Sequence, residues 1–292
     1  MKPLQGKVAV VAGATRGAGR GIAMMLGEAG ATVYVTGRST KGNLSCMGRT
    51  ETIEETAELV TKQGGKGIAV RVDHTVEEDI KVLFTKIQDE QNGQLDILVN
   101  DVWGGDPLTE WEKPFWEHNL HNGLLMQQRA VHSHIMTSHY GVPLMVKNKM
   151  GLVIEITDGV DYQYRGNLYY SLAKVSTIHL AEAMAKDLEQ QNITAVAVSP
   201  GFLRSEAMLD IFGVTEENWR EGAKQDPHFI ASETPFFVGR AVAALASDPN
   251  VHEKTGRALS SWELGREYGF TDMDGRRPDW GKYFEENVLN QN

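Results

Sequence analysis

Tyr170 and Lys174 stand one helical turn apart in the segment LYYSLAK, a spacing that brings both side chains to one face of a helix. A free tyrosine hydroxyl, with a pKa of ~10, is poorly matched to proton transfer near neutral pH. The positive charge of a neighbouring lysine favours the tyrosinate and lowers that pKa. The pair therefore predicts an acid–base step, such as protonation of a carbonyl oxygen while a hydride adds to its carbon.

The residues before this helix do not include the serine that such a step ordinarily uses. A serine hydroxyl would donate a hydrogen bond to the carbonyl oxygen, but the candidate positions hold Thr157 and Asp158. Threonine can donate the same bond, whereas an ionised aspartate donates none. A carboxylate ~4 Å from the developing oxyanion would oppose it by about 4 kcal/mol at an effective dielectric constant of 20. That energy corresponds to about three decades in rate.

Three arrangements reconcile these two residues with catalysis. In the first, which we favour, Thr157 faces the substrate and Asp158 points away. In the second, Asp158 is protonated in a dry pocket and donates the hydrogen bond. In the third, the substrate carries positive charge, as an iminium or an amine does, and the Asp158 carboxylate stabilises that charge. Because adjacent side chains at a strand end point to opposite sides, only one of the two should face the substrate.

Strand and helix patterns alternate around these residues. Continuous apolar runs, typical of strands buried on both faces of a parallel sheet, occur at 7–12, 31–36, 67–73, 95–100, 151–157 and 193–199. Helical periodicity fills the gaps at 21–29, 53–62, 77–91 and 172–188. The alternation predicts an α/β fold, a single-domain Rossmann fold over residues 1–292 in which a doubly wound parallel sheet carries helices on both faces.

Two connections are longer than this unit requires, residues 101–118 and 202–235, and residues 265–292 form a C-terminal extension. Loops at the carboxyl ends of parallel strands bind ligands in such folds. We therefore expect both connections to line the substrate site. The aromatic residues of the first connection favour a fairly apolar substrate.

The segment GATRGAG places Gly13, Gly17 and Gly19 between the first strand and a helix. N–H groups at a helix N-terminus bind a pyrophosphate, and a Cβ there would block the approach of the phosphate to the backbone. The spacing differs from the common GxGxxG, but its place after a strand predicts a nucleotide-binding loop. We expect Thr15 and Arg16 to belong to this site.

The second predicted strand ends in VTGRS, with Gly37 and Arg38 where NAD-preferring sites usually carry an acid for the ribose 2′-OH. Arg38 and Arg16 together supply two guanidinium groups, which suit a 2′-phosphate, so NADPH is the predicted cofactor. Asp73, at the end of the third strand, can bind the adenine amine. Asn100, at the end of the fourth, can tie neighbouring loops together.

The composition favours a cytoplasmic protein without nucleic-acid or membrane partners. A net charge of −10 opposes binding to nucleic acids and anionic membranes. The N-terminal region lacks an apolar signal core, and no run approaches the ~18 apolar residues of a spanning helix. The single cysteine, Cys46, fits a reducing compartment and is expected to be inert. His132 and His134 point to different faces of a helix, so no metal site is expected.

In this order, the glycine loop, VNDV and the YxxxK motif resemble the short-chain dehydrogenase/reductase family of NAD(P)-dependent oxidoreductases over nearly the whole chain. The resemblance implies that Tyr170 is the general acid/base and Lys174 its partner. Pro200 and Gly201 would border the nicotinamide, and Ser205 would contact its carboxamide. The implied cofactor contacts are Gly13, Gly17, Gly19, Asn100, Tyr170, Lys174, Pro200, Gly201 and Ser205.

The chain differs from the family pattern at two further positions besides that of the serine. Asp101 stands for the second asparagine of the family's NNAG, and Gly123, beside Asn122, occupies the position of a relay asparagine when residues are counted from Trp116. Two hypotheses remain. The leading one is an NADPH-dependent reductase of a carbonyl or imine in a small, fairly apolar molecule. The alternative is a catalytically impaired NADP-binding sensor or scaffold, which the changed positions favour and the intact Tyr170 and Lys174 oppose.

Apolar residues surround more than one face of the helix predicted at 172–188, at Leu172, Val175, Ile178, Leu180, Ala181 and Met184. The preceding long helix adds Leu120, Leu124, Leu125, Val131 and Ile135. One sheet face cannot cover all of these side chains. We expect a homodimer or homotetramer built on the two helices, as the family resemblance also implies.

Overall fold

The computed structural model describes residues 2–45 and 48–289, and Cys46 lies outside them. Seven strands form one parallel sheet in the order β3-β2-β1-β4-β5-β6-β7. The strands are β1 (Val8–Ala12), β2 (Thr32–Gly37), β3 (Lys66–Arg71), β4 (Ile97–Asn100), β5 (Gly151–Ile156), β6 (Ile193–Ser199) and β7 (Ala258–Ser260). The first six confirm the predicted strands with shifts of at most two residues at either end. β7 was not predicted.

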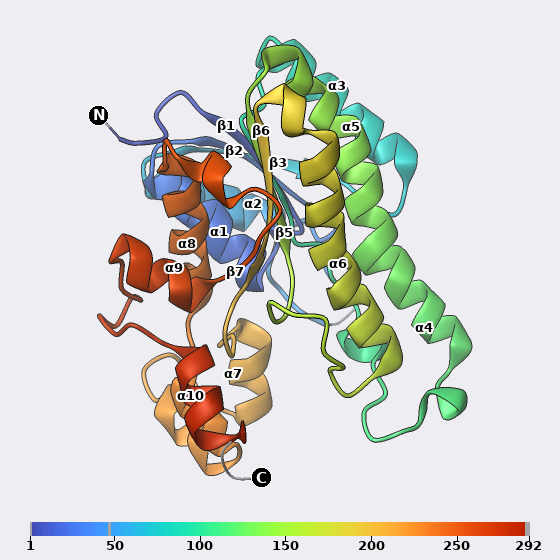
Figure 1. Cartoon of the computed structure of the whole chain (residues 1–292), viewed down its shortest axis with the longest axis vertical. Helices are drawn as coiled ribbons and strands as arrows, with labels where there is room; N and C mark the ends of the chain where they lie inside the picture. The colour runs from blue at the N-terminus through green and yellow to red at the C-terminus, as the bar shows by residue number, and fades with distance from the viewer. Residues whose placement is uncertain (1, 46–47, 290–292) are drawn as a thin grey trace.

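Helices cover both faces of the sheet (Figure 1). One layer holds α1 (Gly17–Glu28), α2 (Ile53–Lys62), α8 (Pro235–Ser247) and α9 (Ser261–Tyr268), and the other holds α3 (Glu77–Glu90), α4 (Leu120–Gln127), α5 (Ser133–Asn148) and α6 (Leu168–Asp187). Successive β1 residues serve different cores: Val11 packs with Ile22 of α1, and Val10 packs with Leu83 of α3. This double burial explains the continuous apolar strands and confirms the doubly wound α/β fold.

Local hydrogen bonds decide where the helices begin. α6 starts four residues before the predicted position because the Asn167 side chain accepts from the Tyr170 N–H at 3.0 Å, as an N-cap. The Asn167 amide also donates to the Glu110 carbonyl at 2.9 Å, which ties the 101–118 connection to α6. A π-helical turn at Gln128–His132 joins α4 to α5. Such turns often accompany functional sites.

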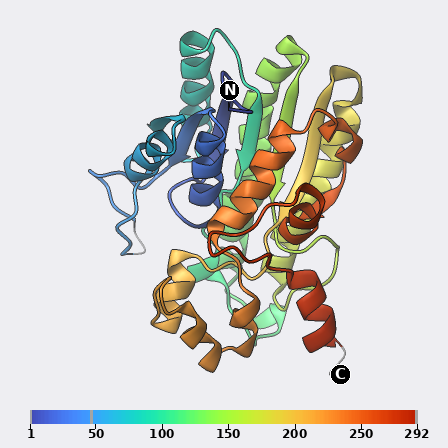
Figure 2. The ribbon, with the colours of Figure 1, turned by 90° about the vertical axis from the view of Figure 1, so that its left-hand side faces the viewer.

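The 202–235 connection forms a lobe at the carboxyl ends of the strands (Figure 2). It contains α7 (Glu206–Phe212) and a small core of Phe212, Trp219 and Phe229. α10 (Trp280–Asn287) packs against this lobe, with the Trp280 and Phe202 rings 5.6 Å apart. In the described part of the chain, no helix combines the length and the apolar character needed to span a membrane.

Candidate active site

The glycine loop between β1 and α1 lies against the end of β4. Gly13 has a φ of +89°, and a Cβ on it would come 2.5 Å from the Asp101 carbonyl oxygen. A Cβ on Gly19 would come 2.4 Å from the Gly13 carbonyl oxygen and 2.8 Å from Asp101 Oδ2. Gly17 has a φ of +57° but faces more open space. Backbone contacts therefore exclude a side chain at two of the three positions.

A carboxylate from a distant segment already binds the first N–H of α1. Glu206 Oε2 lies 2.8 Å from the Gly17 nitrogen, and Glu206 Oε1 lies 3.9 Å from Arg20 Nε. Nothing in the sequence predicts this contact, because Glu206 is separated from Gly17 by 189 positions. The contact forms because the segment between β6 and α7, which contains Pro200, Gly201 and Ser205, brings Glu206 next to the glycine loop. The Gly201 N–H donates to Glu233 Oε2 at 2.9 Å, and Ser205 caps α7.

The two predicted guanidinium groups stand near the ends of β1 and β2. Arg16 Nη2 donates to Ser45 at 3.2 Å, while its Nη1 is buried without a hydrogen-bond partner among the described residues. Burial lowers the pKa of Arg16. Arg38 Nη1 lies 3.8 Å from Asp73 Oδ2, and the other Asp73 oxygen accepts from Thr75. Asp73 is therefore held by protein groups on both oxygens.

The side chains at the end of β5 separate as the strand alternation requires, but in the sense opposite to the arrangement we favoured. Thr157 is 2% exposed, and its hydroxyl donates to the Lys174 carbonyl oxygen at 2.7 Å. Asp158 Oδ2 accepts from the Tyr170 hydroxyl at 2.8 Å. The preference for Thr157 as the side chain beside the tyrosine is corrected, since its hydroxyl is committed beneath α6. Asp158 holds that place.

The electrostatic setting of Tyr170 also differs from the expected one. Burial, and then the Asp158 carboxylate, raise the pKa of Tyr170, and Arg165 opposes them. The predicted net lowering of this pKa is not found in the protein alone, because burial, the larger cause, and the Asp158 carboxylate together raise it. Burial lowers the pKa of Lys174, against Asp158 and Asp101. The Lys174 Nζ sits 4.2 Å from the centroid of the Trp103 ring, a cation–π contact.

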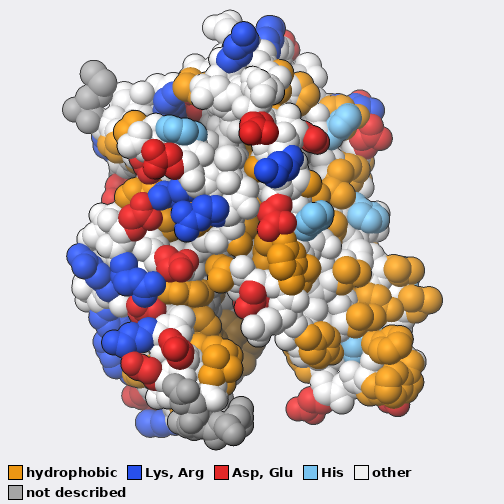
Figure 3. Space-filling model, viewed as in Figure 1, with side chains coloured by type: hydrophobic (Ala, Val, Ile, Leu, Met, Phe, Trp, Pro, Cys, Tyr) orange, Lys and Arg blue, Asp and Glu red, His pale blue; other side chains and the backbone are white. Residues whose placement is uncertain are grey.

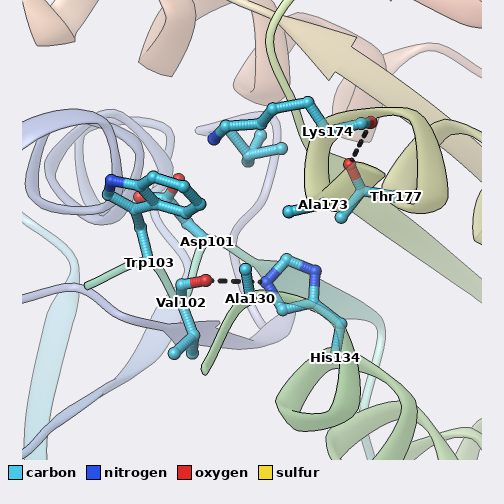
Figure 4. Close-up of a pocket in the computed structure, with 9 residues that line it drawn as sticks. Asp101, Val102, Trp103, Ala130, His134, Ala173, Lys174 and Thr177 are labelled. Atoms are coloured by element: carbon cyan, nitrogen blue, oxygen red, sulfur yellow. Dashed lines mark hydrogen bonds between the residues drawn. The ribbon is translucent and has the colours of Figure 1, made fainter. Parts of the chain in front are cut away.

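A small pocket beside Lys174 joins the two halves of the site (Figure 4). Asp101, Trp103, Ala130 and His134 line it together with Lys174. Burial raises the pKa of Asp101 to about 7, although Lys174 and His134 lower it. Asp101 therefore contacts the glycine loop on one side and shares a cavity with Lys174 on the other.

The residues that approach Lys174 from the α4–α5 layer were not identified from the sequence. Ala130, in the π-helical turn, and His134, in α5, reach the pocket. Gly123 does not, because it packs against the Tyr169 ring, where a Cβ would lie 2.4 Å from ring carbons. The expected relay position at Gly123 and Asn122 is thus corrected.

Asn100 is fully buried and is not among the residues that line this pocket. Its amide nitrogen donates to Glu155 Oε1 at 2.7 Å and to Ser138 at 2.9 Å. Glu155 Oε2 lies 2.6 Å from His134 Nδ1, and His134 Nε2 lies 3.1 Å from the Val102 carbonyl oxygen. Because Nε2 faces a carbonyl it must carry a proton. The network ties β4, β5 and α5 together, whereas Asn100 was predicted to tie neighbouring loops.

The 101–118 connection covers Tyr170 with two indole rings. Trp103 meets the Tyr170 ring edge-on at 5.4 Å between centroids, and Trp111 meets it at 5.3 Å. A hollow separates this connection from the 202–235 lobe in the space-filling view (Figure 3). Among the described residues, no group of three or more His, Cys, Asp or Glu side chains could hold a metal ion.

Comparison with known proteins identifies the family. The model of the short chain dehydrogenase family matches residues 7–212. The chain belongs to the short-chain dehydrogenase/reductase family. It is 35% identical over 278 residues to Dehydrogenase/reductase SDR family member 1 of Mus musculus, covering 94% of this chain and 85% of that protein. The Homo sapiens protein of the same name is 34% identical over 283 residues, with the same coverage.

A solved structure of a short chain dehydrogenase from Mycobacterium thermoresistibile has the same fold, with a TM-score of 0.78 at 21% identity. That similarity covers 95% of this chain and 92% of the solved one. Three segments of the sequence predict that the chain falls in the subgroup of member 1: GATVYVTGRS, the Trp-rich connection after DILVN, and the C-terminal stretch ending in GRRP. The identity to the two member 1 proteins confirms this prediction. A short-chain dehydrogenase/reductase is an oxidoreductase, and the family binds NAD(P).

The residues of the glycine loop suit the phosphates of such a cofactor. Glu206 sets a carboxylate oxygen on the Gly17 N–H, where a phosphate oxygen would accept. The unpartnered buried nitrogen of Arg16 suits a second phosphate contact. A side chain at position 37 would have to displace Thr15, since a Cβ on Gly37 would lie 2.4 Å from Thr15 Oγ1. When bound, NAD(P) supplies or accepts a hydride, and these residues would hold its phosphates.

Proposed function

We propose that the protein is an NADPH-dependent oxidoreductase that reduces a carbonyl or imine in a small, fairly apolar substrate, with Tyr170 as the general acid/base. One observation carries the proposal: the Lys174 Nζ lies 5.6 Å from the centroid of the Tyr170 ring and shares a pocket with Asp101, which lies against the glycine loop. Ligands of open α/β folds bind at this edge. Trp103 and Trp111 give the substrate an apolar wall.

The contacts of each residue suggest its role with a neutral carbonyl substrate. Tyr170 keeps its proton in the free protein, because burial and Asp158 raise its pKa. A carbonyl oxygen that gains negative charge becomes a stronger base and draws that proton from the hydroxyl. The Lys174 ammonium, 5.6 Å from the Tyr170 ring centroid, stabilises the tyrosinate left behind. NADPH, rather than NADH, is proposed because Arg16 and Arg38 suit its 2′-phosphate.

The Tyr170→Phe variant tests this role. It should lower turnover of neutral carbonyl substrates by about 10²-fold or more, the range for a general acid, with NADPH affinity nearly unchanged. Tyr169→Phe, at the adjacent tyrosine that packs on Gly123, is the matched control and should retain activity. Full activity in Tyr170→Phe would contradict the proton-donor role.

The second candidate is an NADP-binding sensor or scaffold without turnover. Asp158 at the serine position favours it, because a carboxylate opposes the oxyanion of ordinary carbonyl reduction. Turnover on a panel of aldehydes, diketones and cyclic imines separates the two candidates. NADPH binding measured by fluorescence, without turnover of any panel member, would support the sensor.

We also propose that the protein pairs with a second copy of itself. Leu120 and Leu124 of α4 and Leu172 of α6 are 62%, 57% and 51% exposed, and apolar side chains gather over this side of the molecule (Figure 3). Ile178 and Ala181, also expected at the interface, are buried within the chain, so the apolar face is narrower than predicted. A dimeric or tetrameric mass by light scattering is expected, and a monomeric mass at micromolar concentration would contradict it.

Its remaining partners follow from composition. The net charge of −10 disfavours nucleic acids and anionic membranes, which leaves small molecules as the proposed ligands. A chain with one cysteine suits a reducing compartment, so we propose a cytoplasmic location. Fractionation of cells that express the tagged chain tests this.

A further inference from the structure

We infer that the group reduced by this enzyme is an iminium ion, C=N⁺, and that Asp158 is the residue that selects it. The inference rests on the proposed function, since it assigns a substrate class to the same Tyr170 and Lys174 site. It starts from the hydrogen bond between the Tyr170 hydroxyl and Asp158 Oδ2, 2.8 Å long. A group that ordinarily donates to the substrate is here replaced by one that, when ionised, only accepts.

Two cations act on the Asp158 carboxylate, Lys174 and Arg165, and neither donates a hydrogen bond to it among the described residues. Arg165 Nε lies 4.0 Å from Asp158 Oδ2, but the Arg165 guanidinium donates to the Gln163 carbonyl at 2.6 Å and to the Asp161 carbonyl at 2.7 Å. It also bonds the Asp161 carboxylate at 3.2 Å. The Asp158 side chain is 49% exposed, so the carboxylate can meet a ligand that enters from solvent. Asp106 adds negative charge that acts on both Tyr170 and Lys174.

The walls beside this carboxylate are aromatic and held in place. Trp103 and Trp111 both pack on the Tyr170 ring. The Trp103 indole N–H donates to Asp106 Oδ1 at 2.6 Å, and the Asn167 amide fixes the connection that carries both rings. Indole rings next to a carboxylate are a good setting for an organic cation. The Trp103 ring is already paired with the Lys174 ammonium, 4.2 Å from its centroid, so Asp158 and Trp111 are the groups that would receive a ligand cation.

The chemistry of an iminium suits this setting better than that of a ketone. Hydride addition to a ketone creates an oxyanion, which Asp158 repels and which needs the Tyr170 proton. Hydride addition to an iminium forms the C–H bond while the C=N π pair becomes the lone pair of a neutral amine. The positive charge passes to the oxidised nicotinamide, so one iminium and one NADPH give one amine and one NADP⁺. No proton has to leave Tyr170, whose pKa burial and Asp158 raise.

A matched substrate pair tests the inference. N-methyl-3,4-dihydroisoquinolinium carries a permanent iminium charge, and 1-tetralone is a neutral ketone of similar size and shape. The wild type should show a kcat/KM about 10²-fold higher for the iminium. Asp158→Asn should lower iminium reduction by about 10-fold or more, and Asp158→Ser should also raise reduction of 1-tetralone. Asp89→Asn, an exposed position on α3 with the same loss of charge, should change neither.

Two further measurements separate this inference from the proposed function. Tyr170→Phe should cost about 10²-fold with 1-tetralone but less than about threefold with the iminium, because only the ketone needs the proton. The saturated ammonium N,N-dimethyltetrahydroisoquinolinium should quench tryptophan fluorescence of the NADPH complex, and Asp158→Asn should weaken its binding by about 10-fold.

Each outcome has a separate meaning. A wild type that prefers 1-tetralone, or an Asp158→Asn variant that reduces the iminium unchanged, overturns the inference and leaves the reductase proposal standing. If neither substrate is reduced by the wild type or by Asp158→Ser while NADPH still binds, the reductase proposal fails. In that case, binding of the saturated ammonium that depends on Asp158 would still support a cation site. If the ammonium does not bind, the cation site is contradicted as well.

Discussion

The glycine loop and the surroundings of Tyr170 meet across Asp101, yet they follow the family pattern to different degrees. On the cofactor side a Cβ on Gly13 or on Gly19 would meet a backbone carbonyl oxygen at 2.5 or 2.4 Å. On the catalytic side Tyr170 and Lys174 keep their places, while Asp158 stands where a serine is usual. Backbone contact limits which residue a position can accept. Positions that only present a functional group can exchange one chemistry for another.

The largest expected effect tests whether the catalytic side still works as an acid–base pair. Lys174→Ala should lower turnover of neutral carbonyl substrates by about 10³-fold, because Lys174 is the ammonium nearest the tyrosinate. NADPH binding should weaken too, as the family resemblance places this amine near the nicotinamide ribose. Lys186→Ala, in the last turn of the same helix, is the control. Equal turnover in the two variants would show that the pair is no longer used.

The second effect tests the geometric limits of the cofactor side. Gly19→Ala should lower the free energy of unfolding by about 3 kcal/mol, since its Cβ would lie 2.4 Å from the Gly13 carbonyl oxygen. Gly17→Ala should cost only about 1 kcal/mol, the strain of a left-handed alanine, because its Cβ comes no closer than 4.0 Å to Ser205. Denaturant titration measures both. The same cost in both variants would mean that the loop relaxes and that backbone contact does not protect the glycines.

The fold could be predicted from the sequence because its signals are local. Continuous apolar runs marked six strands, and a glycine loop between a strand and a helix marked the cofactor side. β7 escaped because it has only three residues, Ala258–Ser260, and its place beside β6 is a long-range pairing. The start of α6 was misplaced because the capping residue, Asn167, precedes the apolar pattern that defines the helix.

The parts of the site that could not be predicted depend on side-chain direction or on distant contacts. Thr157 and Asp158 are adjacent, so a shift of one position in alignment exchanges their roles. Only the hydrogen bonds to the Lys174 carbonyl and to the Tyr170 hydroxyl distinguish them. His134 was weighed only as a metal ligand, because its place beside Lys174 depends on how α5 packs in the fold. Glu206 reaches Gly17 through the fold alone.

The third effect sharpens the cofactor side. The wild type should bind NADPH at least tenfold tighter than NADH, about 1.4 kcal/mol or more. Arg38→Asp should reduce or reverse this ratio, because it replaces a cation beside the expected 2′-phosphate with an anion. Lys66→Asp, at the opposite end of β3 from the site, makes the same charge change and should leave the ratio intact. Equal wild-type affinities for the two cofactors would mean that Arg16 and Arg38 do not reach the ribose.

The smallest effect concerns Glu206, which places on the cofactor side the same kind of group that Asp158 places on the catalytic side. Its carboxylate holds the Gly17 N–H at 2.8 Å and lies 3.9 Å from Arg20, so a pyrophosphate must displace it from both. Glu206→Gln keeps the shape but removes the charge. It should tighten binding of NADPH and of NADH by the same factor, about fivefold or ~1 kcal/mol, because both cofactors carry the pyrophosphate.

Titration of both cofactors at two salt concentrations measures this effect. The gain should shrink at high salt, where the repulsion between the carboxylate and the phosphates is screened. Glu217→Gln, an exposed acid in the same lobe, should change neither affinity. A shift in the NADPH/NADH ratio would place Glu206 at the ribose instead of the pyrophosphate. Unchanged affinities would mean that the Glu206 side chain leaves Gly17 without a cost in free energy. Glu206 would then not influence cofactor binding in the way that Asp158 is proposed to influence substrate binding.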